Sequence, residues 1–148
     1  MSRPSFVYVS YIATTRDKLW AALTQPQFTK EYWGGREVES DWKVGSKVAY
    51  KLTGSYTVDG EILECDPPAK LVVTWRSQGR PATKVSFTID AAGPEDVRLT
   101  VVHEEHEAGS EVGDELRMGW PAVLSSLKTL LETGRGLDVV KRWSSQKR

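Results

Sequence analysis

Apolar residues keep a helical period near the end of the chain, between Ser110 and Gly134. Large apolar side chains recur there at steps of three or four residues, at Val112, Leu116, Trp120, Val123, Leu127 and Leu130. This spacing places them on one stripe of an α-helix. Ser110 suits the N-cap, and Gly134 suits the left-handed conformation that ends a helix. The pattern therefore predicts a long amphipathic helix that needs a broad apolar partner.

The residues before this helix mostly follow the period of a β-strand. Residues 6–12 are β-branched and aromatic on both faces. Apolar and polar residues alternate in several later stretches, most clearly at residues 47–53, 71–75, 85–90 and 97–104, and a further strand is expected at 56–64. Two short helices are expected after the first strand, around Leu19 to Leu23 and over residues 26–32, with Gly34 and Gly35 ending the second.

This order of elements predicts an α+β fold. Short connections between the later strands favour an antiparallel meander of about six to seven strands. A curved sheet with one apolar face and one amphipathic helix buries both by wrapping the sheet around the helix. We expect one domain over residues 1–136 and a tail over 137–148 that is either frayed or a short helix. A gap is expected wherever the curvature of the sheet departs from the path of the helix.

Composition narrows the function classes. The 20 positively charged residues balance the 20 negatively charged ones, so the broad basic footprint of a nucleic-acid-binding protein is absent. Cys65 is the single cysteine, which excludes an internal disulfide and fits a reducing compartment. No apolar run is long enough for stable membrane insertion. We expect a cytoplasmic protein without a cofactor.

The segment His103-Glu104-Glu105-His106 looks like a metal motif but has the wrong spacing. A zinc protease needs two histidines four residues apart on a helix, whereas these are three apart in a predicted strand and face opposite sides. We therefore expect no metal site. His103 alone shares the inward face with Leu99 and Val101. A structural histidine, a residue that orients a ligand and a general base all remain open interpretations. Cys65 is interpreted as a packing residue.

Several stretches, taken together, resemble a known family. They are YIATTRDKLWAALTQPQFTKEYWGG, DWKVGSKVAYKL, GEILECDPPAKLVVTW, VRLTVVHEE and GWPAVLSSLKTLLE. In this order they resemble bacterial proteins similar to the C-terminal domain of the Hsp90 ATPase activator, within the START/Bet v 1-like (SRPBCC) superfamily. The resemblance implies a helix-grip fold with a hydrophobic cavity between sheet and long helix, used across the superfamily for lipids, sterols, polyketides and plant hormones. Arg16 departs from the family, which usually has proline there.

The predicted ligand site is the wall of this cavity. Its residues are expected to be Trp33, Tyr50, Trp75, Phe87, Leu99, His103, Trp120 and Leu124. Segment 32–35, with its glycine pair, is expected near the mouth, where it can gate entry. The alternative is that side chains fill the gap completely.

Binding of a hydrophobic small molecule is the function that these observations favour. A cyclase or hydratase-type enzyme is the first alternative, because polar residues in an apolar cavity can transfer protons. Tyr50, Glu61, Arg76 and His103 are candidates for that role, but spacing fixes none of them, and no catalytic residue is assigned. A co-chaperone-like interaction domain with a chaperone partner is the second alternative. The basic residues after 140 can also touch an anionic partner or surface.

Overall fold

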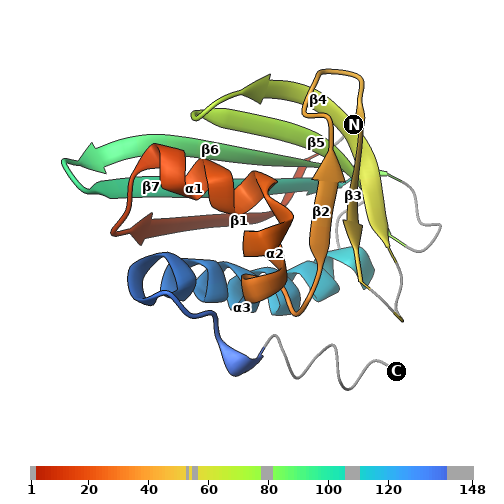
Figure 1. Ribbon diagram of the computed structural model, residues 1–148. Helices are drawn as coiled ribbons and strands as arrows, with labels where there is room; N and C mark the ends of the chain where they lie inside the picture. Colours follow the sequence, from red (N-terminus) through yellow and green to blue (C-terminus); the bar gives the residue numbers. More distant parts are fainter. Residues whose placement is uncertain (1–2, 53, 55–56, 78–81, 106–110, 140–148) are drawn as a thin grey trace.

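The computed structural model describes residues 3–52, 54, 57–77, 82–105 and 111–139 (Figure 1). It contains seven strands and three helices in this part of the chain. The elements in order are β1 Arg3–Ile12, α1 Arg16–Thr24, α2 Pro26–Tyr32, β2 Glu37–Ser40, β3 Lys47–Lys51, β4 Val58–Asp66, β5 Lys70–Ser77, β6 Thr83–Gly93, β7 Asp96–Glu105 and α3 Glu111–Thr133.

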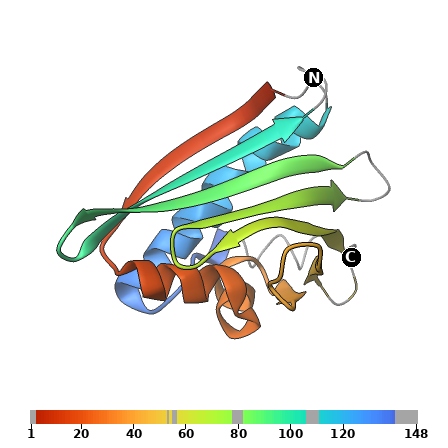
Figure 2. The same ribbon diagram turned by 90° about the horizontal axis from the view of Figure 1, so that it is seen from above.

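The seven strands form one antiparallel sheet. Strands β2 to β7 pair with their neighbours in sequence, and β1 pairs with β7, so β1 and β2 are the two edges. Figure 2 shows β1 as the outermost strand beside β7, with α3 running behind the sheet. Helix α2 lies beside β2 and contacts both α1 and α3. This is the predicted helix-grip α+β architecture, in which a curved sheet holds a long C-terminal helix.

Irregular pairing and one close backbone approach accompany the curvature of the sheet. The register shifts at three places, between Pro4 and Phe6 in β1, between Ile62 and Glu64 in β4, and between Ala91 and Gly93 in β6. Such bulges bend a strand and increase its twist. At Gly60 in β4, an added Cβ would lie 1.9 Å from the carbonyl oxygen of Thr74. Only glycine fits this contact without a shift of the backbone.

The predicted helix boundaries are confirmed where the structure describes them. The Thr15 side chain accepts a hydrogen bond from the Lys18 amide and so caps α1, while Pro26 occupies the first turn of α2. Gly134 has a φ of 90° and ends α3. The predicted cap Ser110 and the side chains of Val112 and Leu116 lie outside the described residues, whereas the rest of the predicted stripe faces the core.

Two strand predictions need correction. The pattern misses β2, because its four residues Glu-Val-Glu-Ser include only one apolar side chain, Val38, which is buried. The strand expected at 85–90 is longer, since β6 continues to Gly93 and β7 begins at Asp96. Residues 53, 55 and 56, at the junction of the strands expected at 47–53 and 56–64, lie outside the described residues. The other predicted strands are present with ends shifted by a few residues.

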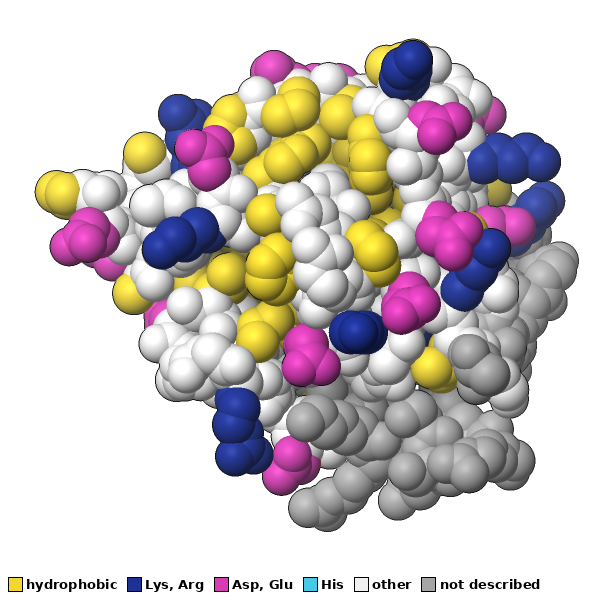
Figure 3. All heavy atoms as spheres, viewed as in Figure 1, with side chains coloured by type: hydrophobic (Ala, Val, Ile, Leu, Met, Phe, Trp, Pro, Cys, Tyr) yellow, Lys and Arg dark blue, Asp and Glu magenta, His cyan; other side chains and the backbone are white. Residues whose placement is uncertain are grey.

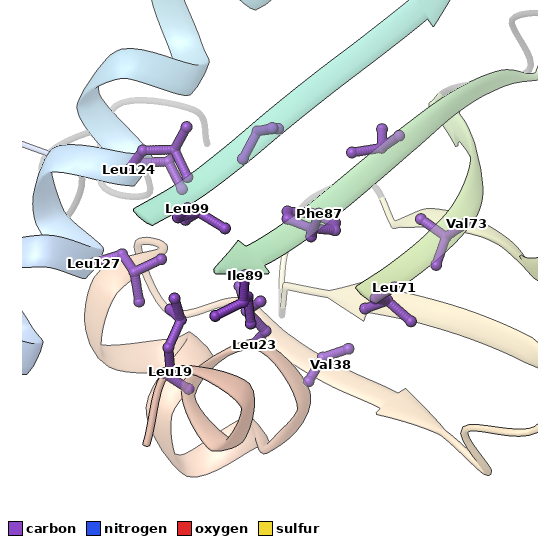
Figure 4. Close-up of a cluster of buried hydrophobic side chains, with 14 of the residues drawn as sticks. Leu19, Leu23, Val38, Leu71, Val73, Phe87, Ile89, Leu99, Leu124 and Leu127 are labelled. Atoms are coloured by element: carbon purple, nitrogen blue, oxygen red, sulfur yellow. The ribbon is translucent and has the colours of Figure 1, made fainter. Parts of the chain in front are cut away.

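An aliphatic core fills one end of the space between the sheet and the helices (Figure 4). Its buried side chains come from α1, from the sheet and from α3, and include Leu19, Leu23, Ile89, Leu99, Leu124 and Leu127. Burying each such side chain contributes roughly 1.5–3 kcal/mol before the loss of conformational entropy is subtracted. This end therefore holds α1 and α3 against the sheet.

Polar contacts fix the C-terminal end of α3. Lys128 Nζ donates to the Tyr11 carbonyl oxygen and is paired with Glu132, whose carboxylate also accepts from the Ala13 amide. The Leu137 amide donates to Ser126 Oγ at 2.9 Å, so the chain folds back along the helix. The predicted tail beyond residue 139 lies outside the described residues. Within the described part of the chain, none of the helices has the length and hydropathy to cross a membrane.

Candidate functional site

A cluster of aromatic rings occupies the other end of the space between sheet and α3. Trp33 and Trp75 stack with ring centroids 5.7 Å apart and planes 13° from parallel. Tyr50 lies 5.1 Å from Trp33 and 5.0 Å from Trp75, and Trp120 lies 5.3 Å from Trp75. Phe87 meets Trp120 edge to face at 6.1 Å. We call Trp33, Tyr50, Trp75, Phe87, His103 and Trp120 the aromatic cluster.

Each member of the aromatic cluster comes from a different element. Tyr50, Trp75, Phe87 and His103 are contributed by β3, β5, β6 and β7, and Trp120 by α3. Side chains of alternate strand residues share one face, so the strand pattern directs these four to the inner side of the sheet. Trp33 follows α2 as its C-cap, before two glycines with positive φ. Six separate segments of the sequence thus each contribute one side chain to this end.

The aromatic cluster is buried at its base and reaches the surface at its rim. Tyr50, Phe87, His103 and Trp120 are at most 4% exposed. Trp33 and Trp75 are only half-buried. The stacked indole pair is therefore the part of the cluster that solvent reaches.

Six of the eight predicted site residues meet in this cluster. The other two, Leu99 and Leu124, lie in the aliphatic core, where Figure 4 shows them close to one another. The structure thus places all eight between the sheet and the helices and divides them between an aromatic end and an aliphatic end.

His103 holds a hydrogen-bond chain through the base of the cluster. Trp120 Nε1 donates to His103 Nδ1 at 3.0 Å. Because an indole nitrogen can only donate, Nδ1 carries no proton and the proton sits on Nε2. His103 Nε2 lies 2.6 Å from Thr83 Oγ1, which in turn donates to the Trp75 carbonyl oxygen at 3.1 Å. Each donor in this series of hydrogen bonds has one acceptor.

This arrangement keeps the imidazole neutral. Burial lowers the pKa of His103 from 6.5 to about 4. Protonation of Nδ1 would also place two donors against each other, because Trp120 cannot accept. With both ring nitrogens bonded, the geometry favours the structural interpretation of His103 over the general base.

Two buried tyrosines beside Trp33 contrast with this satisfied histidine. Tyr32 is 1% exposed and Tyr50 is 2% exposed, and the rings of both contact Trp33. Neither hydroxyl has a hydrogen-bond partner among the described residues. Burial raises the pKa of both phenols, and Tyr50 raises that of Tyr32 further through Coulomb repulsion. Sequence reasoning placed Tyr32 near the mouth, as part of segment 32–35, but missed its burial.

The remaining candidates lie elsewhere. Glu61 and Arg76 are exposed, and Arg76 Nε pairs with Asp59 at 3.3 Å. Cys65 is half-buried, and burial, followed by the nearby Asp66 charge, raises the pKa of its thiol, so it is not an activated nucleophile. Among the residues that the structure describes, no three His, Cys, Asp or Glu side chains are placed to hold a metal ion. His106 lies outside them.

A surface hollow of about 350 Å³ lies at the far end of α3 and contains none of the predicted site residues. It is lined by Tyr11, Ile12, Ala13, Ala92, Asp96, Lys128 and Glu132. There, Lys128 donates to the Tyr11 carbonyl oxygen of β1, and Glu132 accepts from the Ala13 amide just after β1. We therefore interpret the hollow as the outer side of a helix attachment.

Surface charge agrees with the balanced composition. Figure 3 shows basic and acidic side chains interspersed on the face that carries α1 and α2, with apolar side chains gathered toward its middle. On this face the described residues form no field of a single sign. The aromatic cluster is thus the feature with the most defined chemistry.

Comparison with known proteins supplies a family. Residues 13–132 match the family model described as Activator of Hsp90 ATPase homolog 1-like protein. No curated protein matches the chain.

Solved structures share the fold at low sequence identity. The Aha1 dimer from Colwellia psychrerythraea has a TM-score of 0.75 at 20% identity, over 92% of this chain and 99% of that one. CalU16 from Micromonospora echinospora has a TM-score of 0.70 at 22% identity, over 95% of this chain and 81% of that one. An HSP90 activator from Plasmodium falciparum, PFC0360w, has a TM-score of 0.67 at 23% identity, over 81% and 87%.

Proposed function

The chain belongs to the Activator of Hsp90 ATPase homolog 1-like family, and on that premise we propose that it binds a mainly apolar small molecule at the aromatic cluster. The ligand enters beside Trp33 and Trp75 and lies against the inner rings. Affinity comes from burial of apolar surface, and orientation comes from a few polar groups. No chemical step is part of the proposal.

The observation that carries this proposal is the half-burial of the stacked indoles above a fully buried base. Large aromatic side chains normally bury most of their surface in a core. Here Trp33 and Trp75 keep part of theirs accessible although Tyr50 and Trp120 beneath them are closed off. A ligand that stacks on the indole pair would cover apolar surface that the fold leaves open.

The enzymatic alternative has less support from the geometry. A general base needs a free nitrogen within hydrogen-bond reach of the substrate, whereas Trp120 and Thr83 hold both nitrogens of His103. Glu61 and Arg76 are exposed and do not belong to the aromatic cluster. Tyr50 is the one catalytic candidate of the four with a free polar atom at the site.

The chaperone alternative follows from family membership alone. It predicts that the chain stimulates the ATPase of its host's Hsp90 without any small molecule. A measurement of that ATPase in the absence of any added small molecule separates this alternative from ligand binding. The expectation of a cytoplasmic location stays a prediction.

Calorimetric titration with 2-ethylnaphthalene tests the proposed function, and Trp75→Gln is the decisive variant. The wild-type chain is expected to bind one equivalent. Trp75→Gln removes one stacking face and introduces a polar amide, so affinity is expected to fall at least tenfold.

Trp20→Gln is the matched control, because Trp20 also packs against the core but has no ring contact with the aromatic cluster. Its affinity is expected to equal that of the wild type, with far-UV circular dichroism showing that both variants are folded. Equal binding by wild type and Trp75→Gln would rule out the named site. Native mass spectrometry of the freshly purified protein, followed by extraction, would identify any ligand already bound.

A further inference from the structure

The hydroxyl groups of Tyr32 and Tyr50 are buried polar atoms that have no hydrogen-bond partner among the described residues. Both side chains are almost fully buried, and both rings contact Trp33. The two come from different elements, Tyr32 from the end of α2 and Tyr50 from β3. Tyr32 directly precedes Trp33 in the sequence, whereas Tyr50 reaches the same ring through tertiary packing.

A buried hydroxyl without a partner is costly and uncommon. Buried polar groups are nearly always hydrogen-bonded, and a lost partner costs about the full desolvation of the group. The fully buried hydroxyls of Thr29 and Ser126 obey the rule. Thr29 Oγ1 accepts from the Val38 amide, and Ser126 Oγ accepts from Leu137. Two exceptions beside the same indole ring call for a shared explanation.

The chemistry of the two phenols defines what would satisfy them. A neutral phenol donates one hydrogen bond and accepts others. Burial raises the pKa of both groups, so they stay protonated donors throughout the physiological range. The nearby Arg36 guanidinium offers only donors, and its Nη1 is bonded to the Tyr50 carbonyl oxygen. The complement of the pair is therefore an acceptor oxygen.

We propose that the Tyr32 and Tyr50 hydroxyls form the polar end of the ligand site and donate to an acceptor oxygen, such as a ketone, on an otherwise apolar ring compound. This inference rests on the proposed function and names the ligand class that the site prefers. The aromatic cluster contributes area, and the two phenols select among ligands of similar shape.

The first test measures the unfolding of the empty protein. Tyr50→Phe and Tyr32→Phe remove only the hydroxyl. Because neither hydroxyl is bonded, the thermal midpoint of each variant is expected to equal or exceed that of the wild type. Tyr11→Phe, at an exposed tyrosine outside the site, is the matched control. A clear fall in midpoint in either buried variant would show that the phenol already has a partner and would overturn the inference.

The second test compares two probes, 2-acetylnaphthalene and 2-ethylnaphthalene, which share a ring system and differ in the carbonyl oxygen. Wild-type protein is expected to bind the ketone about tenfold more tightly. This preference should shrink to near unity in Tyr50→Phe and weaken in Tyr32→Phe, because each variant keeps the ring and loses only the donor. Tyr11→Phe should keep the full preference.

The outcomes separate the two proposals. Equal binding of both probes by the wild type would overturn the role of the phenols and leave the aromatic site intact. Failure of both probes to bind would contradict the proposed function itself. A ketone preference that survives in both Phe variants would place the acceptor contact at another residue.

Discussion

The two ends of the interface between sheet and α3 differ in the chemistry of their side chains. At one end, aliphatic side chains such as Leu99, Leu124 and Leu127 are at most 2% exposed and have no polar atoms to satisfy. At the other, aromatic side chains surround a histidine, two phenols lack partners, and Trp33 and Trp75 reach solvent. The same helix and sheet supply both ends.

Under the proposed function, this contrast separates stability and recognition along one helix. An aliphatic core is stabilised by burial alone and tolerates no ligand-sized opening. Aromatic rings with polar atoms can present flat surfaces and directional bonds. The difference predicts that changes at the aliphatic end act mainly on folding, whereas changes at the rim of the aromatic end act mainly on binding.

The largest expected effect comes from creating a cavity at the aliphatic end. Leu127→Ala removes a side chain that is fully buried, so the free energy of unfolding is expected to fall by about 2–5 kcal/mol. Denaturant unfolding measures this change. Calorimetry below the transition should give the wild-type affinity for 2-ethylnaphthalene. A loss of affinity in the folded variant would show that the two ends are not separate.

The next effect is a pH dependence specific to the aromatic end. His103 has a folded-state pKa of about 4, below its ordinary 6.5, so the unfolded chain binds more protons between these values. The free energy of unfolding should therefore fall as pH drops from about 6.5 to 4, by roughly 3 kcal/mol from this group.

Nuclear magnetic resonance can follow the His103 ring directly, and His103→Gln provides the comparison for stability. The ring signals should stay those of a neutral imidazole at pH 5.5, and the Gln variant should lose most of the slope in this window. A titration midpoint near pH 6.5 for the His103 ring signals would contradict the hydrogen-bond chain described for this residue.

The smallest of these effects sharpens the role of Thr83. Thr83→Val keeps the shape but removes the acceptor of His103 Nε2 and the donor to the Trp75 carbonyl oxygen. A buried donor without an acceptor costs about 1–3 kcal/mol, which denaturant unfolding would detect. Thr88→Val, on the same strand but outside the hydrogen-bond chain, is the control. Equal free energies of unfolding for the two variants would show that the hydrogen-bond chain through His103 contributes nothing to stability.

Periodicity predicted most of the fold because its long elements carry clear patterns. The stripe of α3 from Trp120 onward and the alternation in β6 are local signals, and the structure confirms them. Strand β2 was missed because one buried valine among charged neighbours gives no period. The family resemblance added the helix-grip arrangement, which local patterns only favour.

The candidate site was predictable as a set of inward residues and not as a network. Alternation alone places Tyr50, Trp75 and His103 on the inner face. The bond between Trp120 and His103 joins residues of α3 and β7, and the pairing of His103 with Thr83 depends on the register of β6 and β7. The isolation of the Tyr32 and Tyr50 hydroxyls depends on every neighbour at once. These contacts are set by tertiary packing, so local sequence patterns do not reveal them.

The pairing of β1 with β7 sets the order in which this chain can mature on the ribosome. Arg3 in β1 lies opposite Glu105 in β7, whereas β2 to β6 each meet a neighbour that has just been synthesised. The meander can thus assemble while the chain is still growing, but β1 must wait. Contacts so distant in sequence form slowly, and Ile12 of β1, which is buried in the folded protein, stays exposed to chaperones meanwhile. Closure of the sheet is therefore a late event in the life of the nascent chain.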